Sequence, residues 1–99
     1  MNYKGGRWKA KREAILRRDK YTCQESKRYG KRITANTVHH IYPVELYPAL
    51  AFVSWNLVSL SAEKHNAMHD RETHELTALG LEWQRRRAPQ FKAWLEDLS

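Results

Sequence analysis

The stretch Thr37–Ile41 (TVHHI) places two adjacent histidines between β-branched residues. Such residues favour a strand, and a regular strand sends neighbouring side chains to opposite faces. The strand predicted here, residues 33–41 with a break allowed at Asn36, therefore carries His39 and His40 on opposite sides. All five histidines of the chain lie between positions 39 and 74, which makes their placement the most informative feature of the sequence.

A second histidine pair, His65 and His69, lies in the segment that begins twenty-five residues beyond His40. Ser61 is a good N-cap, so we expect a helix from Ala62 to about His74. Residues four apart share one face of a helix, so this pair would be within reach of one ion. A third imidazole, from His39 or His40, would complete a tripod with open positions for substrate.

The alternating stretch Asn56–Leu60 (NLVSL) is typical of a partner strand. Strand 33–41, strand 56–60 and helix 62–74 would then form a ββα unit, which makes the fold class α+β. Around it the sequence predicts a basic helix over Trp8–Arg18, a short strand at Tyr21–Cys23 and a turn within Gln24–Lys31 that Gly30 closes. It also predicts a packed connection over Tyr42–Ser54 with a helical turn after Pro48, a helix over Leu76–Arg87 interrupted or capped at Gly80, and an amphipathic segment over Phe91–Leu98 set apart by Pro89.

Composition limits the class of protein. Ninety-nine residues make one small domain, and eleven aromatic residues provide bulky core material. No apolar run approaches the roughly 20 residues that a membrane span needs, and the first residues lack the apolar segment of a secretory signal. A single cysteine, Cys23, excludes an internal disulfide, so a reducing, cytoplasmic location is the simplest expectation.

Charge is unevenly distributed along the chain. Residues 1–32 hold twelve Lys and Arg against three acids, a net of +9, whereas residues 33–84 hold two against six, a net of −4. Residues 85–99 return to +2, with four against two. A basic front and tail around an acidic middle suggest a polyanion partner held by the ends. The alternative is a solvated surface that keeps the chain soluble.

Four fragments, in this order, resemble the HNH nucleases of the ββα-metal superfamily: RRDKYTC (17–23), VHHI (38–41), NLVSL (56–60) and KHNAMH (64–69). The resemblance covers residues 8–75, with a helical extension after them. The combination of HH with HxxxH is similar to the nuclease domain of the DNase colicins. The size and the fragment series also resemble the small stand-alone HNH proteins that phages encode near their packaging genes.

The resemblance implies a role for each matching residue. His39, where many members have Asp, would be a metal ligand, and His40 the general base. Asn56 would hold the loop and help to orient that base. His65 and His69 would complete the metal site. A histidine near its ordinary pKa of about 6.5 can take a proton from water at physiological pH.

The implied activity is divalent-metal-dependent hydrolysis of DNA phosphodiester bonds by a one-metal mechanism, which leaves 5′ phosphate and 3′ hydroxyl ends. The ion would be Mg²⁺, Mn²⁺, Ni²⁺ or Zn²⁺, because three imidazoles favour transition ions whereas abundance favours magnesium. We expect low intrinsic sequence specificity, no membrane partner, and targeting by a phage packaging protein such as the terminase in the bacterial host. The sequence does not determine whether the substrate is DNA or RNA, whether the product is a nick or a double-strand break, or what the oligomeric state is.

The basic segments provide candidates for contact with the nucleic-acid backbone. A solvated helix end is the alternative for the three arginines near the C-terminus. The candidates are Arg7, Lys9, Lys11, Arg12, Arg17, Arg18, Arg85, Arg86 and Arg87.

One departure from the family pattern concerns zinc. Many HNH proteins brace the motif with two Cys-x-x-Cys pairs, which here read Cys23–Ser26 and Ser61–Lys64, with three of the four thiols missing. We therefore expect no structural zinc and a buried Cys23. Hydrophobic packing should replace the metal, with Trp8, Ile15, Leu57, Leu60 and the segment Leu76–Trp83 in the core.

Other functions stay open from the sequence. A non-catalytic nucleic-acid-binding domain with a structural metal held by the histidines predicts salt-sensitive binding, metal-dependent folding and no cleavage. A toxin-like nuclease that needs an inhibitor partner is a weaker interpretation. His74 drifts off the ligand face of the predicted helix and is expected at the surface.

Overall fold

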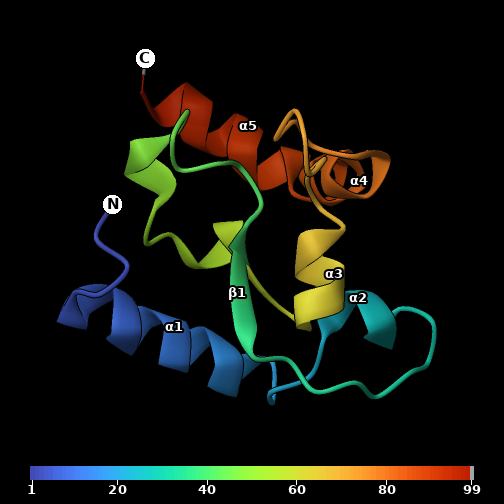
Figure 1. Cartoon of the computed structure of the whole chain (residues 1–99). Helices are drawn as coiled ribbons and strands as arrows, with labels where there is room; N and C mark the ends of the chain where they lie inside the picture. The colour runs from blue at the N-terminus through green and yellow to red at the C-terminus, as the bar shows by residue number, and fades with distance from the viewer. Residues whose placement is uncertain (99) are drawn as a thin grey trace.

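Two short antiparallel strands lie at the centre of the computed structural model, which describes residues 1–98. Strand β1 (Thr37–His40) pairs with β2 (Leu57–Leu60), with His40 opposite Leu57. Helix α3 (Ala62–Asn66) follows β2 directly, so two strands and a helix succeed one another in the predicted ββα order. In Figure 1, α1 and α3 lie on different sides of β1.

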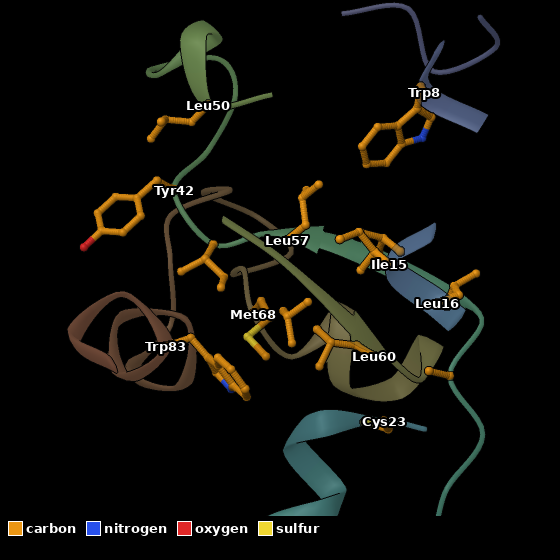
Figure 2. Close-up of a cluster of buried hydrophobic side chains, with 14 residues drawn as sticks. Trp8, Ile15, Leu16, Cys23, Tyr42, Leu50, Leu57, Leu60, Met68 and Trp83 are labelled. Atoms are coloured by element: carbon orange, nitrogen blue, oxygen red, sulfur yellow. The ribbon is translucent and has the colours of Figure 1, made fainter. Parts of the chain in front are cut away.

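Helix α1 (Gly6–Arg18) covers one face of this sheet, because its apolar residues Trp8, Ile15 and Leu16 are buried and the rest of its surface is polar. Figure 2 shows the Ile15 side chain beside Leu57. Ser59 ties the two elements together: its backbone N–H donates to the carboxylate of Asp19 at 3.1 Å. The basic N-terminal helix predicted from Trp8 is therefore confirmed, with its start at Gly6.

The remaining elements are short and connect or cover this centre. The prediction of one helical turn after Pro48 is confirmed. The elements are α2 (Gln24–Lys27), the 3-10 helices η1 (Pro48–Leu50) and η2 (Ser54–Asn56), α4 (Ala78–Arg86) and α5 (Ala88–Asp97).

The predicted strand 33–41 is too long, because its first part pairs with a different segment. The N–H of Cys23 donates to the carbonyl of Ile33 at 2.7 Å, and the N–H of Ala35 donates to the carbonyl of Tyr21 at 2.8 Å. These bonds form one isolated antiparallel bridge, between Thr22 and Thr34, so the short strand expected at Tyr21–Cys23 is wrong as well. The strand predicted from Asn56 also begins one residue later.

The predicted helix from Ala62 to His74 is wrong beyond Asn66. Ser61 caps it as expected, since its hydroxyl accepts from the N–H of Lys64 at 3.3 Å. The carboxylate of Asp70 then accepts from two successive backbone N–H groups at 2.8 and 2.9 Å, which stabilises a turn instead of a further helical turn. His74 in this turn has a φ of 64°, a left-handed conformation that a helix excludes.

The two C-terminal helices also differ from the prediction. Gly80 neither interrupts nor caps α4; Thr77 is the N-cap, and its hydroxyl accepts from the Gly80 N–H at 3.2 Å. A Cβ at Gly80 would lie 2.6 Å from the carbonyl oxygen of Met68, so the glycine permits close packing. Pro89 lies in the first turn of α5, where its missing N–H needs no partner, and not before the helix.

The core agrees with the sequence. Trp8, Ile15, Leu57 and Leu60 are all 5% exposed or less, and Cys23 is fully buried. The predicted contribution of the segment 76–83 comes from Trp83, which Figure 2 shows near Met68. None of the helices within residues 1–98 is long and apolar enough to span a membrane.

Candidate active site

A cavity of about 1250 Å³ runs along β1, and all four residues of the strand line it. Successive side chains of a strand point to opposite faces, so four in a row can line one cavity only along the strand's edge. That edge is open because the sheet has two strands within the described residues. Both His39 and His40 therefore border the same space while their side chains face apart.

His39 faces α3 and meets the second histidine pair there. Its ring centre lies 5.6 Å from that of His65 and 5.7 Å from that of His69. His39 is 2% exposed, and its Nε2 has no hydrogen-bond partner, the one buried side-chain nitrogen or oxygen in this state among the described residues. An unpaired buried nitrogen is costly unless something occupies the space before it.

The environment favours the neutral form of His39 and His65. Burial, followed by the neighbouring His65, His69 and His40, lowers the pKa of His39 to about 3. Burial and the proximity of His69 also lower the pKa of His65. A neutral imidazole is the form that donates a lone pair to a metal.

The donor set can be compared with the needs of a divalent ion. Imidazole nitrogens bind Zn²⁺ at about 2.0–2.1 Å, so the ring centres of two ligands on one tetrahedral ion lie about 5 Å apart. The two ring separations at His39 come close to that value, and its Nε2 is unpaired. Across residues 1–98, however, no three His, Cys, Asp or Glu side chains form a ready-made metal site. His65 and His69 are half-buried, and three imidazoles are a donor set that transition ions such as Zn²⁺ favour.

His69 reaches this place by a route that the sequence pattern did not predict. It lies beyond α3, in an isolated bridge with Leu76, and not one helical turn after His65 on a shared face. The pairing with His39 therefore depends on the loop after Asn66, whereas the helical spacing argument is wrong. His74 is exposed as expected, although it lines the rim of the same cavity.

His40 faces α1, where its partners differ from those of His39. Its ring stacks on Trp8 with centres 5.1 Å apart, and its Nε2 lies 3.0 Å from the carbonyl oxygen of Ala51. A carbonyl only accepts, so Nε2 carries the proton and Nδ1 of the neutral ring keeps its lone pair. Burial lowers the pKa of His40, opposed by the Ala51 carbonyl and the nearby carboxylate of Glu45.

Asn56 is fully buried and acts on the backbone around His40. Its Oδ1 accepts from the N–H of Tyr42 at 2.7 Å, and its Nδ2 donates to the carbonyls of Tyr42 and Leu50 at 3.1 and 3.2 Å. Leu50 precedes Ala51, the residue whose carbonyl contacts His40. Asn56 therefore holds the chain on both sides of that contact without lining the cavity.

A structure comparison finds the HNH endonuclease of the deep-sea thermophilic bacteriophage GVE2, solved with a manganese ion. The two chains are 33% identical and superpose with a TM-score of 0.63, over 65% of this chain and 70% of that one. This chain belongs to the HNH endonuclease family. No protein-family model matches the sequence, and a comparison with curated proteins also finds no match.

The predicted α+β, ββα fold of this HNH protein is thereby confirmed. Sequence reasoning missed three neighbours of His40: the stacked ring of Trp8, the carbonyl of Ala51 and the carboxylate of Glu45. A backbone carbonyl has no side-chain signature, so no pattern in the sequence predicts that contact. Trp8 was expected in the core, where it is, and only the fold reveals its contact with His40.

Arg12 is one of the residues of this HNH protein predicted to contact the nucleic-acid backbone. It lies in the wall of the cavity along β1, the histidine cavity, which His39 and His40 line. Several others contact the protein itself. Lys9 and Arg17 are exposed. The internal contacts are Arg7 with the Phe52 ring, Lys11 with Ser54, Arg18 with Asp19, Ser54 and Leu57, Arg85 and Arg86 with Glu82, and Arg87 with Trp55.

Proposed function

We propose that this chain is a divalent-metal-dependent endonuclease that hydrolyses phosphodiester bonds in DNA. The observation that carries the proposal is the buried, unpartnered Nε2 of His39 between two further imidazoles, beside a second histidine with a fixed tautomer. Family membership supports the same chemistry, because the related phage GVE2 protein is an HNH endonuclease solved with manganese.

His39, His65 and His69 would hold the ion. When bound, a divalent ion supplies positive charge that stabilises the extra negative charge on the phosphate and on the departing 3′ oxygen. His40 is the general base: the Ala51 carbonyl holds its Nε2 proton, so Nδ1 accepts the proton of the attacking water. Asn56 is a positioning residue, since it fixes the backbone that carries this carbonyl.

The chemistry also accounts for the two directions in which the histidines point. A ligand and a base must act on opposite parts of one reacting phosphate, the leaving and the attacking oxygen. An open strand edge, where both side chains border one cavity, meets this requirement without a break in the strand. Phosphate contacts carry no sequence information, so we expect low intrinsic specificity. Targeting would come from a partner such as a phage terminase.

The test is cleavage of supercoiled plasmid with Mn²⁺, Ni²⁺ or Mg²⁺. His40→Ala should cut about 10²–10⁴-fold more slowly than the unaltered chain, the usual contribution of a general base. Lys92→Gln is the control, because this exposed lysine does not line the cavity along β1. Equal cleavage by the unaltered chain and His40→Ala would refute the assigned base.

The same experiment decides the non-catalytic alternative. A structural metal predicts that EDTA unfolds the chain and that DNA is bound but never cut. The endonuclease proposal predicts that the chain stays folded in EDTA, since the buried core forms around hydrophobic side chains. No cleavage with any of the three ions, together with unfolding in EDTA, would favour the structural-metal function.

A further inference from the structure

A second groove, of about 710 Å³, lies at the C-terminal end of α1, and its charged lining is mostly positive. Asp19 is the one acid among the described residues that line it. Within residues 1–98, none lines both this groove and the histidine cavity, so the two are separate places on the molecule. The basic lining residues are Arg18, Lys20, Lys27, Lys31 and Arg32.

Backbone contacts between distant segments build this groove. The bridge between Thr22 and Thr34 joins the turn after α1 to the chain beyond α2. The N–H of Gly30 donates to the carbonyl of Lys27 at 2.9 Å and closes the loop between them, with Gly30 at a φ of 74° that favours glycine. The basic residues are thus held on one fixed surface, although they lie up to fourteen positions apart in the sequence.

The single carboxylate does not neutralise this surface. Both oxygens of Asp19 accept from the guanidinium of Arg18 at 2.9 Å, and one also accepts from the N–H of Ser59. Arg18 further donates to two backbone carbonyls, so these two residues are satisfied by the protein. Within the described part of the chain, the other four basic residues form no ion pair, and all four are exposed.

We propose that this basic groove binds the phosphate backbone of duplex DNA, as an anchoring site separate from the histidine cavity. Four uncompensated like charges repel one another, and a polyanion relieves this repulsion while it releases its own counterions. An acidic protein is a poorer match, because a protein interface needs an apolar centre. Among the described lining residues only the partly exposed Tyr21 and Ile33 offer large apolar surface.

The two sites lie at neighbouring places along α1. Arg12 lines the histidine cavity and Arg18 lines the basic groove. Six residues of helix span about 9 Å, which corresponds to about three base pairs of duplex at roughly 3.4 Å each. The proposal rests on the proposed function in one respect, namely that DNA is the substrate. It adds that the protein grips the duplex beside the bond it cuts.

The experiment measures binding without cleavage. A fluorescent duplex of about 20 base pairs and arbitrary sequence, long enough to span both sites, is titrated in EDTA across a range of NaCl concentrations. The proteins compared are the unaltered chain, Lys27→Gln/Lys31→Gln and the control Lys4→Gln/Lys92→Gln. The control removes the same two charges from exposed lysines that line neither the groove nor the cavity. Thermal melting confirms that both variants are folded.

The groove variant should bind roughly tenfold more weakly at low salt, and its slope of log affinity against log salt should be less steep by about 2. The control should bind within about twofold of the unaltered chain. Equal losses of affinity in the two variants, or no loss in either, would overturn the proposal. DNA affinity would then not depend on whether the removed charges lie in the groove. Absence of binding by the unaltered chain would overturn it too.

Plasmid cleavage, measured separately, distinguishes this proposal from the endonuclease. If the groove variant loses DNA binding as expected but the unaltered chain never cuts, the proposed DNA-binding groove is supported and the proposed endonuclease activity is refuted. If the unaltered chain cuts and the groove variant binds DNA as well as the control, only the proposed DNA-binding groove is refuted. The His40→Ala variant should retain the full salt-dependent binding in either case.

Discussion

The two sides of β1 surround neighbouring histidines in opposite ways. On the α3 side, His39 is buried next to two other imidazoles, and its Nε2 has no hydrogen-bond partner among the described residues. On the α1 side, His40 is also buried, but its Nε2 has a carbonyl and its ring has an indole to stack on. Two histidines one position apart therefore differ in hydrogen bonding: Nε2 of His39 has no partner among the described residues, whereas Nε2 of His40 has one.

This difference separates two kinds of chemistry. A metal ligand needs a free lone pair and a site that something else completes, and the unpartnered Nε2 of His39 on the α3 side meets both needs. A general base needs one fixed tautomer and a lone pair kept for water, so the α1 side provides a proton acceptor for the other ring nitrogen. Under the proposed function, the packing partners, and not the strand, would give the two histidines their different roles.

The largest effects are expected when each histidine is removed and metal binding is measured. His39→Ala should weaken Mn²⁺ binding by more than the roughly 10–100-fold that loss of a supporting residue costs, and cleavage should fall with it. His40→Ala should bind Mn²⁺ within about threefold of the unaltered chain and still lose about 10²–10⁴-fold in cleavage rate.

Isothermal titration with Mn²⁺ and plasmid cleavage check this on the same samples. If the two variants lost metal binding to the same extent, the histidines would share one role, and the division between the two sides of β1 would be wrong.

The sequence predicts the part of this arrangement that depends on local pattern. The alternation of β1 and β2 predicts that His39 and His40 face apart, and Ser61 marks the start of α3. Those signals lie within a few residues of what they determine. The conclusion that two histidines serve one cavity also needed the open edge of a two-stranded sheet, which no local pattern contains.

The parts that escaped prediction depend on contacts between distant segments. The helix ends at Asn66 because Asp70 organises a turn and Thr77 donates its hydroxyl to the carbonyl of Ala67 at 2.6 Å. The same holds for the Ala51 carbonyl beside His40, which Asn56 helps to hold. Helical propensity favoured continuing through residues 67–74, and tertiary contacts override so weak a preference.

Asn56 supports the α1 side alone, so its removal should affect His40 and leave His39 unchanged. Asn56→Ala should lower the free energy of unfolding by about 2–3 kcal/mol, since three backbone groups lose buried hydrogen bonds. Cleavage should fall with little change in Mn²⁺ affinity, and the pH profile should shift because His40 loses its fixed carbonyl.

The matched control for that variant is Ser59→Ala, another buried polar residue, whose hydroxyl makes one long contact of 3.4 Å to the carbonyl of Ile15. Urea unfolding should show a smaller loss for Ser59→Ala, below about 1 kcal/mol. A normal pH profile in Asn56→Ala, with only stability reduced, would make Asn56 a structural residue without influence on the base.

Acid should destabilise the metal-free protein through the α3 side. The pKa of His39 is lowered to about 3 in the folded chain, against an ordinary value of 6.5. The unfolded state therefore binds a proton first, so stability is complete above about pH 6.5 and falls as the pH drops towards 3. One such group removes about 1.4 kcal/mol per pH unit, or about 2 kcal/mol between pH 7.5 and 5.

Urea unfolding in EDTA at these two pH values measures this loss. Carboxylates titrate mainly below this range, and the lowered pKa values of His40 and His65 act in the same direction as His39. Addition of Mn²⁺ at about pH 7.5 should raise stability, and protons should compete with the ion as the pH falls. Stability that is independent of pH between about 7.5 and 5 would contradict a neutral, buried His39.

The smallest expected effect is a gain in the free energy of unfolding. The change in this free energy should have opposite signs for substitutions on the two sides of β1. His39→Leu replaces an unpaired buried imidazole with an apolar side chain, so the metal-free protein should become more stable by about 1 kcal/mol at about pH 7.5. The part of its pH-dependent stability that comes from protonation of His39 should disappear. His40→Leu removes a satisfied contact to Ala51 and should be destabilising instead. Urea unfolding of both variants in EDTA gives the two signs directly. If His39→Leu were the more destabilising of the two, the α3 side would be held together by its histidines even without an ion, and the unpartnered Nε2 would not mark a place kept for one.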